Sequence, residues 1–237
     1  MTYLCLSLLL TALPPSSTAR WISSGTHQVI MWSWALLPIT LLLGAVGGIL
    51  TACEMAAVYD WLKLSDVPYI SACGINPPQK CIYIQTFNTG AWLALCICLL
   101  RYQQLRDLGH QSRLNQASFG LGLFCSSGAS LMANFQECSQ ELMHQIWAYL
   151  VLLSGTAYFW MQVVFTYRIK PHPGGPWIGP ARVGLCTLST LALGFLAWFH
   201  DSNLQRLSGI SEWVCSFSLF SLFGLFAVDF CHLEKTL

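Results

Sequence analysis

The sequence contains few charged residues. Lys, Arg, Asp and Glu together make up 9% of the 237 residues, whereas hydrophobic residues make up 55%. A soluble domain carries about a quarter charged residues, so this chain could not cover an ordinary water-facing surface. The net charge is only +1, and there is no strongly basic stretch of the kind that attracts nucleic acid. The composition therefore excludes a soluble globular domain and argues against a nucleic-acid partner.

Signatures of catalysis and metal binding are also missing from the sequence. The six histidines are scattered, with no pair at metal-ligand spacing on one helix face. There is no Gly-x-Ser-x-Gly elbow, no phosphate-cradling loop and no His-Glu-x-x-His. Most of the 11 cysteines lie in hydrophobic runs, where Cys behaves as a small apolar residue. We therefore expect a protein that is not an enzyme and that uses no cofactor or metal.

What the sequence does contain is hydrophobic runs of about twenty residues, the length that crosses a bilayer. The connections between these runs are too short and polar to hold a folded domain. A backbone in lipid must satisfy its hydrogen bonds within each span, which favours helices. The sequence predicts an all-α polytopic membrane protein, a six-transmembrane-helix bundle with short loops. The predicted spans are residues 34–58, 82–100, 116–135, 146–167, 183–199 and 213–230.

The predicted membrane domain covers residues 31–237, and residues 1–30 form an N-terminal extension. The extension contains an apolar stretch followed by two prolines, and small residues precede Arg20 as they do at a signal-peptide cleavage site. A basic region before the apolar stretch is missing, however. We therefore favour a poorly ordered extension or an upstream-start variant with Met31 as the alternative first residue. A cleaved signal peptide is the alternative.

The basic residues are concentrated on one side of the predicted bundle. Most follow the second, fourth and sixth spans, which the positive-inside rule places in the cytosol together with both termini. Pro and Gly break helix formation in the connection 168–182, and its Trp177 is suited to the headgroup layer. We expect a basic rim here that contacts anionic lipid or a protein partner. Its candidate residues are Arg101, Arg106, Arg168, Lys170, Trp177 and Arg182.

Two cysteines, Cys73 and Cys81, enclose a short loop that contains the pair Pro77 and Pro78. The predicted topology puts this loop on the extracellular or luminal side, where disulfides persist. Closing so short a loop would contribute roughly 2 to 3 kcal/mol on the chain-entropy estimate. We predict a disulfide between Cys73 and Cys81. Two free thiols that happen to be close are the alternative.

Acidic residues within the spans are the first places to look for function, because each is costly inside a membrane. Glu54 lies close enough to the outer end of its span to reach the interface. Glu212 is expected in the first turn of the last span, where the helix dipole favours a carboxylate. Asp229 lies at the opposite end, where the dipole disfavours it. We therefore predict that Arg101 or Arg182 is its partner.

Two glycines in the first span, Gly44 and Gly48, form a Gly-x-x-x-Gly pair. Such a pair lets another helix approach closely. A contact inside the bundle is favoured, and a dimer contact is the alternative. The sequence leaves the oligomeric state open.

Several short motifs along the chain together resemble a known family. They contain Pro68, Tyr69, Ile70, Ser71, Gly74, Pro77, Pro78, Asn134, Phe135, Gln136, Glu137, Glu212 and Trp213. These residues look like the Frag1/Sfk1 family, which includes the damage-regulated autophagy modulators and the transmembrane protein 150 members. The segments RYQQLRD and PWIGPARVGLC resemble the transmembrane protein 150 branch. The resemblance covers nearly everything from about Met31 onward.

The resemblance implies a protein of the plasma membrane, endosomes, lysosomes or autophagosomes that modulates autophagy and cell survival. It does not imply a biochemical step, so two hypotheses stand. One is a non-catalytic adaptor whose basic rim engages lipids or membrane-trafficking or autophagy proteins. The other is a channel or lipid-transport component built around Glu212 and the turn from Asn134 to Glu137. Recruitment of a phosphoinositide kinase to the plasma membrane is a further alternative.

Overall fold

The computed structural model describes residues 24–63, 66–110, 112–135, 140–169 and 174–231. Its elements are helices, which confirms the all-α prediction for this part of the chain. They are α2 (Ser24–Val58), the 3-10 helix η2 (Ser71–Gly74), α3 (Gln79–Asp107), α4 (Arg113–Asn134), α5 (Glu141–Arg168), α6 (Ile178–Asp201), α7 (Gln205–Gly224) and α8 (Phe226–Cys231). The first helix, α2, extends into the predicted extension 1–30, and the signal-like segment around Arg20 lies outside the described residues.

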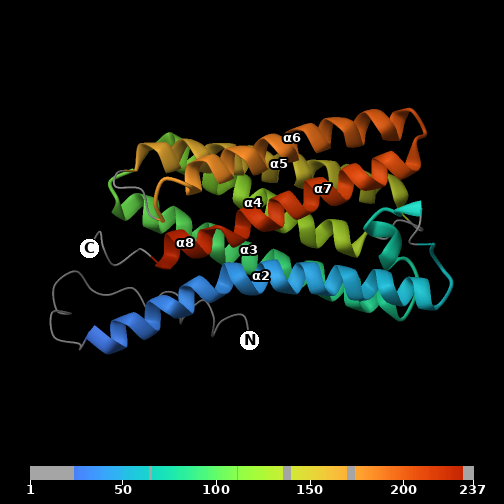
Figure 1. Cartoon of the computed structure of the whole chain (residues 1–237), viewed down its shortest axis with the longest axis horizontal. Coiled ribbons are helices and arrows are strands. Elements are labelled where there is room, and N and C mark those ends of the chain that lie inside the picture. Colours follow the sequence, from blue (N-terminus) through green and yellow to red (C-terminus); the bar gives the residue numbers. More distant parts are fainter. Residues whose placement is uncertain (1–23, 64–65, 111, 136–139, 170–173, 232–237) are drawn as a thin grey trace.

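The long helices lie side by side and run in alternating directions along the long axis of the bundle (Figure 1). Each packs against its neighbour in chain order, and α7 returns to α2 and α5 and closes the bundle. After a break at Leu225, α8 packs against α2. The turns therefore gather at two ends. We call the end where α2 stops and α3 starts the disulfide end, on the right in Figure 1, and the opposite end the arginine end.

Five helical segments in the described residues are long and apolar enough to cross a membrane. Five of the predicted spans lie within them. The predicted third span, 116–135, lies on α4, whose serines and asparagines keep it below the same level of apolarity. The structure thus supports a multi-pass membrane protein, while composition alone does not give six spans. The five segments are Trp34–Val58, Gln79–Asp107, Glu141–Arg168, Ile178–Asp201 and Gln205–Cys231.

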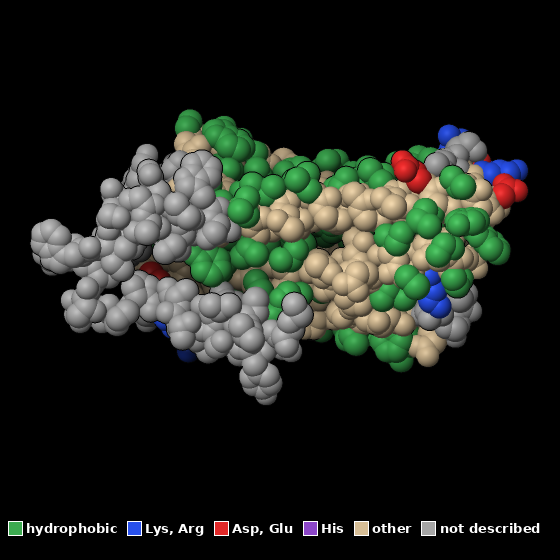
Figure 2. All heavy atoms as spheres, turned by 90° about the horizontal axis from the view of Figure 1, so that it is seen from below, with side chains coloured by type: hydrophobic (Ala, Val, Ile, Leu, Met, Phe, Trp, Pro, Cys, Tyr) green, Lys and Arg blue, Asp and Glu red, His purple; other side chains and the backbone are tan. Residues whose placement is uncertain are grey.

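The surface of the bundle fits contact with lipid. Figure 2 shows one long face, where hydrophobic side chains cover much of the middle and the visible charged side chains lie toward the ends. Large apolar side chains point outward, including Leu43, which is 66% exposed, and Trp198, which is 67% exposed. A soluble protein would leave few such side chains in water without a partner. The sides of the bundle are therefore suited to hydrocarbon.

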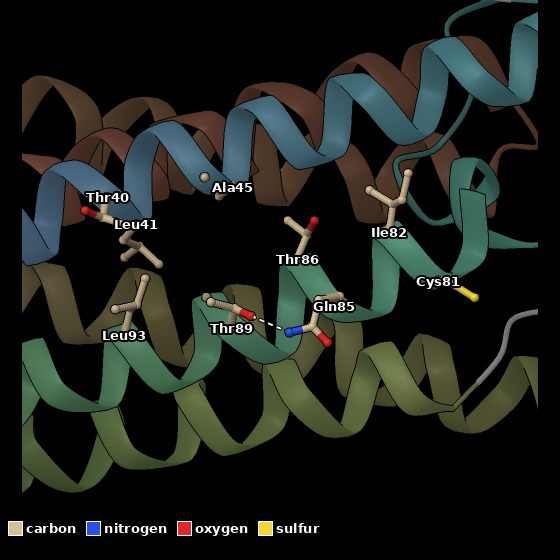
Figure 3. A pocket seen from close by; sticks show the side chains of 11 residues that line it. Thr40, Leu41, Ala45, Cys81, Ile82, Gln85, Thr86, Thr89 and Leu93 are labelled. Carbon is tan, nitrogen blue, oxygen red and sulfur yellow. Dashed lines mark hydrogen bonds between the residues drawn. The ribbon is translucent and has the colours of Figure 1, made fainter. Parts of the chain in front are cut away.

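One of the two glycines predicted to pack inside the bundle does so. A Cβ on Gly48 would collide with the side chain of Thr86 on α3, so glycine is needed for this close approach. Gly44 has open space around it instead. It lines a groove of about 630 Å³ between α2 and α3, where Leu41 faces Leu93 (Figure 3). The Gly-x-x-x-Gly pair is therefore split between an internal contact and an open surface.

Candidate functional site

The loop after α2 is held against α7 by two side chains that are adjacent in the sequence. Trp213 Nε1 donates a hydrogen bond to the carbonyl oxygen of Pro68 at 2.8 Å. The backbone N–H of Ile70 donates to Glu212 Oε2, also at 2.8 Å. We call these four residues the loop clasp. It brings the motif at residues 68–71 and the Glu212-Trp213 pair, which the resemblance singled out separately, into one site.

A glycine makes the loop clasp sterically possible. Gly209 lies one helical turn before Trp213, and a Cβ there would collide with the carbonyl oxygen of Val67. Val67 itself has a φ of 49°, a backbone conformation that is rare for a β-branched residue. The loop is thus pressed tightly onto α7. Sequence reasoning did not single out Gly209, because a glycine near a helix start has many ordinary explanations.

The predicted position of Glu212 in its helix is wrong. The helix α7 begins at Gln205, after a turn in which Asn203 has a φ of 57°. Glu212 therefore lies about two turns inside the helix, beyond the reach of the N-terminal dipole. Its carboxylate accepts the Ile70 N–H instead. Glu54 matches its prediction, because it is exposed about one turn before the end of α2.

The predicted disulfide between Cys73 and Cys81 is also wrong. Cys73, in η2, is bonded to Cys53 of α2, and their Cα atoms are 4.7 Å apart. Cys81 lies in the first turn of α3 as an exposed free thiol, and its side chain points away from α2 (Figure 3). The helix α3 starts directly after Pro77 and Pro78, and this start turns Cys81 outward. Cys53 was overlooked because it resembles any small apolar residue of a span.

The motif around Asn134 joins three helices. Asn134 Nδ2 donates to Asn88 Oδ1 on α3 at 3.2 Å. His144 Nδ1, on α5, lies 2.9 Å from the carbonyl oxygen of Phe135 and 3.0 Å from that of Met132. Because both partners are acceptors, this nitrogen carries the proton. These contacts fasten the end of α4, while the predicted residues Gln136 and Glu137 lie outside the described residues.

The remaining motif positions lie in η2 and in the segments directly before and after it. Gly74 lies against Tyr83, where a Cβ would meet the ring at less than van der Waals distance. Ser71 starts η2, and Pro78 precedes the first residue of α3. Tyr69 reaches across to α6, where its hydroxyl lies 3.3 Å from His200 Nδ1. The family motif at the disulfide end thus packs the loop onto the helices.

A second site, at the arginine end, is a buried charge cluster of Asp229, Arg101 and Arg182. Asp229 Oδ1 lies 3.2 Å from Arg101 Nη1, and Asp229 Oδ2 contacts Arg182 Nη2. The prediction that Asp229 has one of these arginines as its partner is confirmed, and in fact both bind it. The prediction that Arg101 and Arg182 belong to a lipid-contacting rim is wrong, because each is only 1% exposed. A buried charge needs a partner, and here that partner is inside the protein.

Hydrogen bonds extend the charge cluster through the bundle. Arg101 Nε donates to Gln162 Oε1 on α5 at 3.0 Å, and Gln162 Nε2 donates to Ser118 on α4 at 2.8 Å. Arg182 Nη1 donates to Thr166 Oγ1 at 2.6 Å. The ring of Phe226 lies 5.5 and 5.4 Å from the two guanidinium groups, within cation–π range. The cluster therefore ties α3, α4, α5, α6 and α8 together.

The other predicted rim residues differ from these two arginines. Arg106 and Arg168 are exposed at the arginine end, and Trp177 is 51% exposed. Arg113, at the start of α4, is exposed as well. Lys170 lies outside the described residues. Among the described residues, the exposed side chains at this end that suit contact with lipid or protein thus include Arg106, Arg113, Arg168 and Trp177.

The sequence is similar to one family profile and to several known proteins. The profile of the Frag1/DRAM/Sfk1/Cwh43P N-terminal domain matches residues 33–233. The chain is 43% identical to "Modulator of macroautophagy TMEM150B" of Xenopus tropicalis and 42% identical to the Homo sapiens protein of that name, over 86% of this chain and 89% of each relative. It is 27% identical to "Transmembrane protein 150A" of Xenopus laevis, over 84% of both chains. No solved structure matches the chain.

The family profile covers both the loop clasp and the charge cluster, since Pro68 and Trp213 as well as Arg101 and Asp229 fall inside the matched residues. The similarity confirms the resemblance to the transmembrane protein 150 branch. The helices of the described residues agree with a multi-pass membrane protein. The chain belongs to the Frag1/DRAM/Sfk1/Cwh43P family.

Proposed function

We propose that this chain is a non-catalytic multi-pass membrane protein that modulates macroautophagy and cell survival as an adaptor. The observation that carries the proposal is the similarity, over 86% of the chain, to several proteins described as modulators of macroautophagy. The side chains of the charge cluster bind one another, and those of the loop clasp bind the loop backbone. Such contacts hold a scaffold together, which fits the adaptor proposal. Its membranes would be the plasma membrane and those of endosomes, lysosomes and autophagosomes.

The proposed topology has six spans and both termini in the cytosol. With 22 residues at a rise of about 1.5 Å each, α4 is roughly 33 Å long, enough for a hydrocarbon core of about 30 Å. It lies between α3 and α5, both of which are apolar enough to span. The arginine end carries the exposed basic residues and belongs in the cytosol by the positive-inside rule. The Cys53–Cys73 bond fits an extracellular or luminal disulfide end.

The adaptor surface would be the exposed part of the arginine end. Arg106 lies in the last turn of α3, Arg168 is the last residue of α5, and Trp177 comes directly before α6. Exposed basic side chains close to the bilayer attract anionic lipid at about 1 kcal/mol each. We therefore propose anionic lipid or an acidic segment of a trafficking protein as the partner. A channel lined by Glu212 is less favoured, because that carboxylate already binds the loop backbone.

The test is rescue of autophagic flux in cells depleted of this protein. Flux is read from the lipidated autophagosome marker with and without a block of lysosomal degradation. The double variant Arg106→Glu/Arg168→Glu is expected to fail to rescue at wild-type abundance. Arg206→Glu, the same substitution at one exposed position of the disulfide end, is the control and should rescue. Full rescue by the double variant would remove this surface from the mechanism, and normal flux in depleted cells would overturn the proposal itself.

A further inference from the structure

A pocket at the disulfide end lies beside the loop clasp and is used by nothing described so far. It is bounded by the loop after α2 and by α5, α6 and α7, and it measures about 60 Å³. A single buried water needs roughly 10 to 15 Å³ on this measure, so there is room for several waters or a small organic group. The side chains that matter for recognition are Tyr69, Ser71, His144, Tyr149, His200 and Glu212.

Aromatic rings form much of the wall. The ring of His200 meets the ring of Tyr69 edge to face, with centroids 6.3 Å apart, and meets that of Tyr149 in the same way at 6.4 Å. The Tyr69 hydroxyl and His200 Nδ1 share a hydrogen bond of 3.3 Å, which fixes the two rings relative to one another. Three rings from three different segments of the chain thus converge on one small space.

The charge of the lining has one sign. Glu212 contributes a carboxylate, which the Ile70 N–H holds in place at 2.8 Å. Among the described residues that line the pocket there is no Lys or Arg. His144 adds a ring whose Nδ1 already binds two backbone carbonyl oxygens. The lining therefore attracts a positive group and offers little to an anion.

We propose that this pocket binds a small organic cation of the quaternary ammonium class. Aromatic faces combined with a carboxylate stabilise such a cation without any hydrogen bond from it, whereas a metal ion would need more oxygen ligands. His200 lies in the last turn of α6, and His144 lies in the first turn of α5. The pocket is thus close to the end of the spans, at the depth of lipid headgroups. The cation is either the choline headgroup of a lipid or a free solute of the same chemistry.

The experiment uses the full-length protein in nanodiscs of phosphatidylglycerol, with tetramethylammonium chloride as the probe. Transfer of NMR saturation from protein to the probe's methyl protons is followed in a titration, and sodium chloride at equal ionic strength is the reference. We expect saturable binding that Tyr149→Leu and Glu212→Gln each weaken by about tenfold, the scale of one desolvated cation–π contact. Tyr59→Leu, which removes an exposed tyrosine at the same end, should leave binding unchanged.

Two further variants and conditions keep the result interpretable. Glu212→Gln retains an oxygen that can accept the Ile70 N–H. Tyr149→Phe retains the aromatic ring, so this variant should bind tetramethylammonium like the wild type even if Tyr149→Leu folds poorly. Competition when phosphatidylcholine is added to the nanodiscs would support the proposal with a lipid headgroup as the ligand. Binding that persists would support it with a soluble cation. Absence of saturable transfer, or equal transfer in Glu212→Gln, would overturn it. The adaptor surface lies at the other end, so this outcome is independent of the proposed function.

Discussion

The indole nitrogen of Trp213 donates a hydrogen bond to the carbonyl oxygen of Pro68, 145 residues earlier in the chain. Together with the hydrogen bond from the Ile70 N–H to Glu212, this contact attaches the loop between α2 and η2 to α7. Two backbone groups of the loop, the Pro68 carbonyl and the Ile70 N–H, are thus satisfied by side chains of α7. At the opposite end, α8 packs against α2.

Loss of the indole hydrogen bond should loosen the loop clasp. Trp213→Phe keeps most of the ring but leaves the Pro68 carbonyl without its donor, which costs about 1 kcal/mol. We expect a lower apparent unfolding temperature for the purified protein in nanodiscs. Trp198→Phe alters a tryptophan that is exposed on α6 and should have no such effect. Equal unfolding temperatures for Trp213→Phe and the wild type would show that the clasp contributes nothing to stability.

The disulfide assignment is directly measurable. Peptide mapping without reduction should recover Cys53 linked to Cys73, and a membrane-impermeant maleimide should label Cys81 at this end. Cys73→Ser is expected to destabilise the fold by about 3 kcal/mol, the chain-entropy value for a loop of this size. Cys81→Ser is the matched control and should leave stability unchanged. A recovered peptide that links Cys73 to Cys81 would refute the assignment.

The charge cluster should tolerate no single neutralisation. Arg182→Met removes the hydrogen-bond donors of Thr166 Oγ1 and Asp229 Oδ2, and a hydrogen bond that involves a charged group contributes about 1.5 to 3 kcal/mol. We expect low abundance in cells and early unfolding in nanodiscs. Arg106→Met changes an exposed arginine on α3 and should express normally. Normal abundance of Arg182→Met would mean that the cluster is not needed for the fold.

The two glycines of α2 should respond differently to a larger side chain. Gly48→Leu would force α2 away from Thr86, so we expect reduced thermal stability in nanodiscs. Gly44→Leu places the same side chain in the open groove and should be tolerated. The pair is its own control, since the substitution and the helix are identical. Instability of Gly44→Leu would instead reveal a contact that fills the groove.

Much of the fold follows from the sequence. Long hydrophobic runs predict the helices because a lipid environment leaves the backbone few alternatives. The pairing of Asp229 with an arginine also follows, since an acidic group at the negative end of a helix needs a cation. The weaker prediction was the third span, because α4 uses Ser118 and other polar side chains for contacts inside the bundle, and these lower its apolarity.

The site was harder to predict for two reasons. A basic residue near the end of a span gives the same positive-inside signal whether it is exposed, as Arg168 is, or buried, as Arg182 is. Spacing along the chain also favours near neighbours, so Cys81 seemed the natural partner of Cys73, while Cys53 lay in the preceding span. Both errors concern which way a side chain points, and a single sequence contains little information on that.

The order of synthesis gives the charge cluster a role in assembly. Arg101 and Arg182 are synthesised before Asp229. The nascent chain therefore carries two cations whose only buried carboxylate partner among the described residues is added with α8. Within the described residues, the two arginines have no buried carboxylate to pair with until α8 is made. A chain that stops before Asp229 is therefore expected to be degraded faster than one that stops just after Cys231, which a pulse-chase measurement can compare. The cluster thus acts as a check on completion of the chain.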